Sequence, residues 1–299
     1  MKFKAYQSLK TTSIAAIIFI ITGMLIAMVF QSHLAWKTFG WHFITNSNWD
    51  PYNNDFGALT CIFGTIVSSL IAILIAIPVS LFAAYGITEY LPRTFKKYCR
   101  MVFDVMASIP SIIYGFWGIL ILVPIMANTI EPALNASIGK IPFVGLLFQG
   151  PMIGIGILTA GIVLAIMIIP FMLALLLDIF ENIPETSREA AYGLGATRSE
   201  LISVYLHQVK LPWLGTVILG LGRALGETMA VAFVIGNTHQ LGLSLFMPGT
   251  TISATIANEF TEALGVLYPS SLFALGLILF GISFFVILVA RLLLREVEH

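Results

Sequence analysis

The sequence predicts an all-α, polytopic membrane protein with six transmembrane helices. Of its 299 residues, 58% are hydrophobic and only 10% are charged, whereas about 25% of the residues of a soluble globular domain are charged. The mean hydropathy is +0.96. Six stretches are long enough to cross a hydrocarbon core, which needs roughly 20 apolar residues per helix. They are apolar on every face, while transmembrane strands alternate apolar and polar residues, so helices are expected.

The first three spans are separated by polar connections. The first, near 12–31, follows Lys10 and contains no charged residue. The second, near 59–87, is also free of charge. The third, near 102–127, follows a basic cluster that ends at Arg100. Each is long enough for one crossing of the bilayer.

The remaining three spans differ from one another in their charge. The fourth, near 151–177, and the sixth, near 266–290, contain no charged residue. The fifth, near 211–236, contains only Arg223 and Glu227. Charged residues inside a span are rare and usually functional, so the fifth span is the candidate for a substrate path.

Positive residues indicate the orientation. Lys37 and Lys140 fall in connections on one side, Arg223 lies within a span, and the other Lys and Arg residues lie on the opposite side. Because cytoplasmic loops collect Lys and Arg, we expect both termini in the cytoplasm. The protein is expected in the inner (plasma) membrane, surrounded by the lipid bilayer, with residues 1–299 forming a single transmembrane domain.

Charge and cysteine content exclude other classes of function. The net charge is zero and the isoelectric point is near 7.0, so no surface for nucleic acid is expected. The two cysteines, Cys61 and Cys99, form no CxxC motif, and no pair of histidines has metal-ligand spacing. We therefore expect no disulfide, no metal and no cofactor.

The cytoplasmic connection 178–210 predicts two short helices joined by a glycine turn. Pro184 suits the start of the first helix, and Gly195 can adopt the left-handed backbone that ends it. Thr197, with Glu200 three residues later, has the spacing of a capping box that starts the second helix. Judged by charge alone, a solvated loop is an equally good interpretation.

The run Glu189-Ala190-Ala191, three residues and then Gly195 resembles the EAA loop of ABC importer permeases. The resemblance implies that the short helix sits in a groove of an ATP-binding subunit, as amphipathic helices commonly do. It implies coupling roles for Glu189, Ala190, Ala191, Gly195 and Arg198. The chain has no GxxxxGK[ST] phosphate-binding loop. ATP hydrolysis is therefore expected on a partner chain, and this chain is not expected to be an enzyme.

Arg223 lies about 18 Å along the predicted fifth helix, close to mid-membrane. An arginine at that depth costs about 2.5–3.5 kcal/mol on insertion scales and usually faces a water-filled path. Glu227 is expected on the same helical face, within reach of an ion pair, and Thr228 follows it. Two interpretations stay open. The pair neutralises itself and joins helices, or the guanidinium binds a passing anion while Glu227 offsets its charge.

The run GLGRALGETMAV, which contains Arg223, Glu227 and Thr228, resembles the fifth span of the PstC permeases of phosphate ABC importers. In that family the matching arginine and glutamate are associated with phosphate passage. A carboxylate can also accept the proton that hydrogen phosphate carries and sulfate lacks. Further similar runs are ASIPSIIYGFWG at 107–118, GPMIGIGILTAGIVLAIMIIP at 150–170 and MPGTTISATIANEF at 247–260.

The resemblance covers residues from about 57 to 290 and implies a type I ABC importer permease fold. It implies a permease for inorganic phosphate that forms half of a translocation path with a second, homologous permease (PstA-like). A dimer of ATP-binding subunits (PstB-like) and a periplasmic or external phosphate-binding protein (PstS-like) are the other implied partners.

Pro110 lies inside the predicted third span, where a missing amide and a ring clash kink a helix. Such a kink can act as a hinge or gate, and ordinary packing explains it equally well. Three rival functions are a permease for another oxyanion such as sulfate or molybdate, an intramembrane enzyme that uses Glu227, and an ion-coupled carrier acting alone. The sequence offers no second catalytic carboxylate at matching depth, and the coupling loop opposes a lone carrier.

Overall fold

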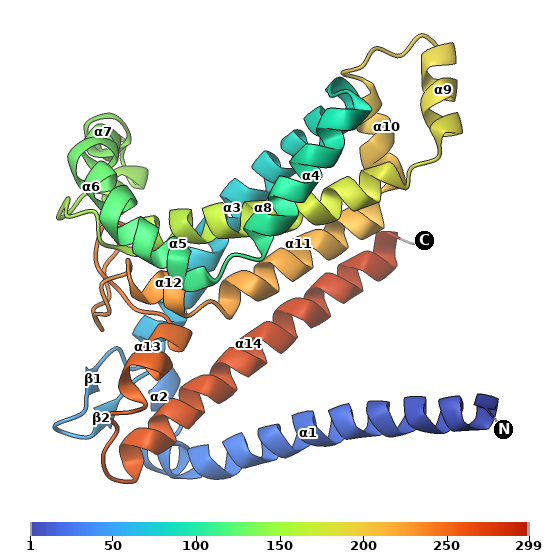
Figure 1. Cartoon of the computed structure of the whole chain (residues 1–299). Helices are drawn as coiled ribbons and strands as arrows, with labels where there is room; N and C mark the ends of the chain where they lie inside the picture. The colour runs from blue at the N-terminus through green and yellow to red at the C-terminus, as the bar shows by residue number, and fades with distance from the viewer. Residues whose placement is uncertain (1, 298–299) are drawn as a thin grey trace.

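The computed structural model describes residues 2–297, with the side chains of 2–6, 8, 9, 290 and 293–297 left aside (Figure 1). Met1, Glu298 and His299, the ends to which the prediction of cytoplasmic termini refers, lie outside the described residues. In chain order the elements are α1 (Lys2–Phe39), α2 (His42–Thr45), β1 (Trp49–Asp50), β2 (Asp55–Phe56), α3 (Leu59–Tyr90), α4 (Arg93–Ala107), α5 (Ser111–Trp117), the π-helix η1 (Gly118–Leu122), α6 (Val123–Ile125), the π-helix η2 (Met126–Ile130), α7 (Glu131–Ser137), the 3₁₀ turns η3 (Ile138–Lys140) and η4 (Val144–Phe148), α8 (Ile157–Glu181), α9 (Glu185–Gly193), α10 (Leu201–Gln208), α11 (Lys210–Leu225), α12 (Met229–Ala232), α13 (Ile252–Glu259) and α14 (Leu267–Val297).

The prediction of a helical, multi-span membrane protein is confirmed. Within the described chain, five helical segments are long and apolar enough to cross a membrane. They are Lys10–Phe39, Leu59–Tyr90, Ser111–Lys140, Ile157–Glu181 and Leu267–Val289. The first, second, fourth and sixth predicted spans correspond to helices α1, α3, α8 and α14. The third and fifth predictions were wrong in detail.

The predicted span 102–127 is not one helix. Helix α4 ends at Ala107 and α5 begins at Ser111. Pro110 occupies the N-cap of α5 in extended backbone, with ψ 135°, because a proline has no amide hydrogen to continue the preceding helix. The prediction of a kink within a continuous span is therefore corrected to a break between two helices. The Tyr114 hydroxyl bridges the break by donating to the Met106 carbonyl oxygen at 2.9 Å.

The predicted span 211–236 is also broken, and this is why the sixth crossing is absent from the segments above. Helix α11 ends at Leu225, with Gly226 as its C-cap. Glycine is about 1 kcal/mol less favourable than alanine in a helix. Glu227 then uses its side chain to start α12, whose Ala230 amide donates to Glu227 Oε1 at 3.2 Å. Local chemistry thus ends one helix and starts another inside the predicted span.

Helix α8 begins six residues after the start of the predicted fourth span, because a tight turn of the chain precedes it. Gly154 has φ +75°, and a Cβ there would lie 2.2 Å from the Val123 carbonyl oxygen. Only glycine combines this left-handed backbone with so close an approach. Helix α8 starts only after this turn, at Ile157.

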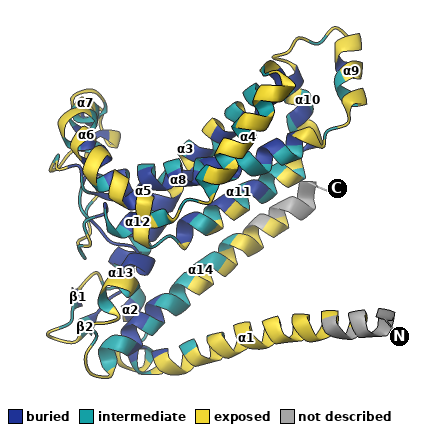
Figure 2. Ribbon diagram, viewed as in Figure 1, coloured by how far each residue is buried: buried dark blue, intermediate teal, exposed yellow. Residues whose placement is uncertain are grey.

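Helices α3 and α8 form the centre of the bundle, and the largest buried cluster is built mainly on them (Figures 1 and 2). Helix α1 is exposed along most of its length (Figure 2). Its last turns are tied to α14 by Ser270, whose Oγ accepts from the Ala35 amide at 3.0 Å and donates to the Gln31 carbonyl at 2.7 Å. Helix α1 begins and α14 ends on the side where α9 and α10 lie (Figure 1).

Candidate functional site: the broken helix and the coupling loop

Arg223 lies on the last turn of α11 and is half-buried. Its guanidinium carbon lies 5.2 Å from the centroid of the Phe171 ring on α8. A ring face attracts a cation without neutralising it. Within the described part of the chain, Arg223 forms no ion pair. Its charge and its planar set of five N–H donors therefore remain available to an anion.

The expected pair between Arg223 and Glu227 was wrong. Glu227 is four residues after Arg223, but the helix ends between them, so the two side chains do not share a helical face. The carboxylate of Glu227 instead accepts from the Ala230 amide at 3.2 Å. Thr228 is half-buried beside it and donates weakly to the Gly226 carbonyl at 3.4 Å. The structure thus brings Arg223, Glu227 and Thr228 to one break in the bundle.

Helix α11 has one covered and one open face. A Cβ at Gly220 would lie 2.9 Å from the Met172 sulfur, so this face is packed against α8. On the other face Leu219 is 56% exposed, and a Cβ at Gly222 would meet no atom within 4 Å. Arg223 lies next to this open face. It is therefore only partly covered by the rest of the described chain.

The two helices predicted in the connection 178–210 are α9 and α10. Gly195 has φ +86° in the turn between them, as predicted. The capping box is half formed, since the Glu200 carboxylate accepts from the Thr197 amide at 2.7 Å and from its hydroxyl at 2.8 Å. These two hydrogen bonds lower the pKa of Glu200.

Helix α9 turns one face outward. Glu189 and Ala190 are exposed, while Ala191 is buried. Leu194, just past the helix, is 90% exposed. Arg198 is exposed, and its guanidinium lies 5.8 Å from the Tyr90 ring centroid. Leu194 therefore adds an apolar side chain to the outward face of this segment.

The inward face of α9 is anchored by Glu89, which sequence reasoning missed. Glu89 lies at the end of α3, and its side chain is 0% exposed. Its Oε2 lies 3.0 Å from Arg188 Nη2 of α9, and its Oε1 accepts from the Tyr205 hydroxyl of α10. Burial opposes the charge of Arg188, but Glu89 and neighbouring tyrosines raise its pKa. The only signal in the sequence was an acidic residue at the end of an apolar span.

A second group that sequence reasoning missed lies at the opposite end of the bundle. The Glu259 carboxylate accepts from Trp49 Nε1 at 2.8 Å and Tyr268 Oη at 2.6 Å, and it lies 3.0 Å from His239 Nε2. His239 Nδ1 faces the sulfur of Cys61 at 3.7 Å. These five residues connect β1, α3, α13, α14 and the loop after Gly236. Cys61 is fully buried, so its thiol is not an accessible nucleophile. The role of these five residues is to hold the segments together.

The charge of His239 makes this cluster sensitive to pH. Burial opposes protonation, but contacts with Cys61 and Glu259 outweigh it and raise the pKa of His239 from 6.5 to about 9. Burial likewise opposes ionisation of Glu259, but the hydrogen bonds from His239, Tyr268 and Trp49 lower its pKa from 4.5. The stabilising effect of His239 is complete below pH 6.5 and is lost as the pH rises through 9. That of Glu259 is present above pH 4.5 and is lost at lower pH.

We therefore expect the melting temperature of the chain in detergent to fall between pH 6 and pH 9.5, and His239→Gln to flatten this fall. The pair stabilises the folded chain by about 2 kcal/mol when both groups are charged. His42→Gln, at an exposed histidine, is the control and should keep the wild-type slope. An alkaline fall that is as steep in His239→Gln as in the wild type would contradict this assignment.

Comparison with known proteins agrees with the fold. Residues 76–299 match the family described as binding-protein-dependent transport system inner membrane component. The phosphate transport system permease protein PstC of Mesorhizobium japonicum is 47% identical over 96% of this chain and 89% of its own length. PstC of Haemophilus influenzae is 43% identical over 97% of this chain and 92% of its own.

A more distant relative and a solved structure extend the comparison. The probable phosphate transport system permease protein PstC of Methanocaldococcus jannaschii is 40% identical over 81% of this chain and 77% of its own. An inward-facing structure of the MetNI methionine ABC transporter aligns with a TM-score of 0.53 and 16% identity, over 81% of this chain and 94% of that one. That likeness shows the fold of an ABC importer permease. The chain therefore belongs to the binding-protein-dependent transport system inner membrane components, and within them to the PstC permeases.

Proposed function

We propose that this chain, residues 1–299, is one permease domain of an ATP-driven importer of inorganic phosphate and forms half of the translocation path. The observation that carries the proposal is Arg223, an unpaired cation beside the open face of a broken helix. The identity of 43–47% with phosphate permeases over nearly the whole chain supports phosphate as the anion.

The broken helix suits a transient anion site. Discontinuous helices at substrate sites expose polar backbone groups that a continuous helix would satisfy. Arg223 contributes two charge-assisted hydrogen bonds to a pair of phosphate oxygens. Glu227, close in the chain, keeps the site from holding the anion too tightly. Glu227 can also accept the proton of hydrogen phosphate, which sulfate cannot supply.

The open face of α11 suits a second permease subunit. Gly222 and Gly226 carry no side chain, and a Cβ at Gly226 would meet only the Gly222 carbonyl, at 3.6 Å. Small residues spaced four apart allow another helix to approach closely. We propose that a PstA-like permease covers this face and that Arg223 then lies between the two subunits, in the shared path.

The α9 surface suits a separate ATPase dimer of the PstB type. Glu189, Ala190 and Leu194 face outward, whereas Arg188 ties the helix to α3 through Glu89. A push on α9 therefore reaches a membrane-spanning helix through an ion pair whose acid is buried. In the proposed alternating-access cycle, ATP-driven closure of the ATPases biases the bundle between two arrangements. The break at Pro110 is proposed as one hinge or gate of this motion.

Stimulation of ATP hydrolysis by loaded binding protein tests the proposed function. The chain is reconstituted with its partner permease, ATPase and binding protein in vesicles. Phosphate-loaded binding protein is expected to stimulate ATP hydrolysis and uptake of labelled phosphate, whereas sulfate-loaded or molybdate-loaded protein is not. Equal or greater stimulation by sulfate or molybdate would favour the other oxyanion. We propose cytoplasmic termini from the distribution of Lys and Arg, and the three protein partners from the family relationship.

Glu189→Lys is expected to weaken recruitment of the ATPase and uptake together, since it reverses a charge on the outward face of α9. A charge-assisted contact at an interface is worth about 1.5–3 kcal/mol, so the loss in affinity is roughly 10-fold or more. Co-purification of the ATPase from detergent measures recruitment. Glu262→Lys, at an exposed residue away from α9, is the matched control. Unchanged recruitment and uptake in Glu189→Lys would refute the docking surface.

A further inference from the structure

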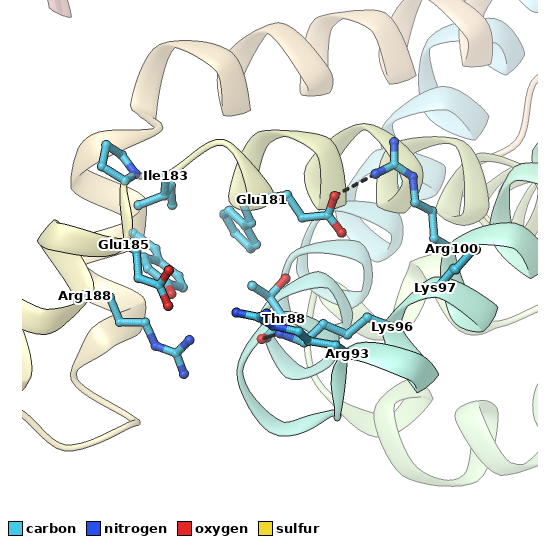
Figure 3. A pocket seen from close by; sticks show the side chains of 12 residues that line it. Thr88, Arg93, Lys96, Lys97, Arg100, Glu181, Ile183, Glu185 and Arg188 are labelled. Carbon is cyan, nitrogen blue, oxygen red and sulfur yellow. Dashed lines mark hydrogen bonds and ion pairs between the residues drawn. The ribbon is translucent and has the colours of Figure 1, made fainter.

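A basic pocket lies between α4 and the α8–α9 connection, away from Arg223 (Figure 3). Its volume is about 430 Å³. Its charged lining residues come from α4, from the end of α8 and from α9, so three segments of the chain meet there. They are Arg93, Lys96, Lys97, Arg100, Glu181, Glu185 and Arg188.

The positive charge of the pocket is only partly neutralised. Arg100 is paired with Asp178 and with Glu181, whose Oε2 lies 2.7 Å from Arg100 Nη1. Arg188 is paired with the buried Glu89. Among the described residues Arg93 and Lys97 form no ion pair, and Lys96 donates only to the Thr88 carbonyl. Three cations therefore face a single unpaired acid, Glu185.

The start of α4 adds to this potential. No side chain caps it, since Pro92 occupies the N-cap position. The free amide groups of the first turn and the helix dipole therefore favour an anion near Arg93. The pocket's cations and this helix start lie together, as Figure 3 shows for Arg93, Lys96 and Arg188 around the opening.

The apolar side of α4 indicates where the pocket lies. Phe95, Tyr98, Val102 and Val105 are 50–61% exposed, and their spacing places them along one stripe of the helix. The basic residues alternate with them at 93, 96, 97 and 100. Lys and Arg residues beside an apolar stripe extend their charged ends toward the membrane–water interface. The pocket then opens at the level of the lipid headgroups.

We propose that this pocket binds a phosphate group, carried by the headgroup of an anionic phospholipid or by free inorganic phosphate. Basic pockets at the cytoplasmic ends of transmembrane helices bind such headgroups. Because the phosphate group contacts α4 and α9 together, its binding holds the coupling helix against the bundle. The proposal is independent of which anion the transporter carries.

Native mass spectrometry of the full chain in detergent tests the proposal, with phosphatidylglycerol and phosphatidylcholine of equal chain length, and with inorganic phosphate as the second arm. We expect phosphatidylglycerol to bind at least tenfold more tightly than phosphatidylcholine. Arg93→Gln combined with Lys97→Gln should weaken binding about 25-fold, since each cation near an anionic lipid contributes about fivefold. Lys140→Gln, at an exposed lysine of η3, should leave binding unchanged.

Glu185→Gln provides a result that misfolding cannot imitate. Removing this acid from the pocket should strengthen binding several-fold. If inorganic phosphate binds with the same dependence on the two cations and phosphatidylglycerol is not preferred, free phosphate is the ligand. If neither ligand responds to Arg93, Lys97 and Glu185, the pocket is not a phosphate site and the proposal fails, whatever the outcome of the transport assays.

Discussion

Arg223→Gln is expected to abolish phosphate uptake by the assembled transporter while leaving membrane insertion and subunit assembly intact. The guanidinium carries the only charge that α11 presents beside its open face. Each charge-assisted hydrogen bond to phosphate is worth about 1.5–3 kcal/mol. Losing two such bonds lowers uptake about 100-fold or more. Labelled phosphate accumulation in vesicles at saturating ATP measures the effect.

A second substitution of Arg223 tests whether uptake requires only its charge or also the shape of its guanidinium, and a lysine elsewhere is the control. Arg223→Lys keeps the charge but lacks the planar fork that holds a phosphate oxygen pair, and it should retain a small part of the uptake. Lys37→Gln, at an exposed lysine at the end of α1, should transport normally. Wild-type flux in Arg223→Gln, with assembly confirmed by co-purification, would remove Arg223 from the path. Should a structure of the whole transporter place this side chain against lipid, the proposed path fails as well.

Glu89→Ala is expected to release α9 from the bundle. It leaves the half-buried Arg188 without its carboxylate and deprives the Tyr205 hydroxyl of its acceptor. Breaking a buried ion pair costs about 3–5 kcal/mol of folding free energy. Because the Arg188 side chain is 34% exposed, we expect the loss of this pair to cost an amount near the lower end of that range. The melting temperature in detergent should fall by about 5 °C or more.

Trypsin provides the second measurement of this release. Arg188 and Arg198 flank the turn after α9, and cleavage there should accelerate when the helix detaches. Glu89→Gln, which keeps an acceptor for Tyr205 but not the charge, should be affected less. Glu262→Ala, at an exposed acid away from α9, should resemble the wild type. An unchanged melting temperature and cleavage rate in Glu89→Ala would show that the ion pair is not the anchor.

Sequence reasoning succeeded where the signal is local. The apolar stretches predicted helices α1, α3, α8 and α14, because a run of apolar residues of that length has few alternatives in a membrane. Pro184, Gly195 and Glu200 predicted the two helices of the connection 178–210, because capping and left-handed turns depend on residues a few positions apart. Arg223 was recognised because a charge inside a span is costly wherever the helix lies.

Sequence reasoning failed where a local break competes with an apolar run. Gly226, with Glu227 as a cap for α12, ends the predicted fifth span, and Pro110 ends α4 instead of kinking one helix. Both signals were present in the sequence, but the apolar composition of the surrounding residues outweighed them. The expected pair of Arg223 and Glu227 was wrong for this reason, since i,i+4 reasoning holds only within a continuous helix.

By itself the sequence determined that the chain is helical, crosses a membrane several times, carries a cation within its fifth apolar stretch and turns at Gly195 in the connection 178–210. Only the tertiary structure decided that Glu89 holds Arg188, that Glu259 joins His239 to Trp49 and Tyr268, and that Arg223 remains unpaired beside an open face. Composition and the spacing of nearby residues reflect interactions within one segment of the chain. Contacts such as Trp49 with Glu259, 210 positions apart, form only when the packing of separate helices brings those residues together.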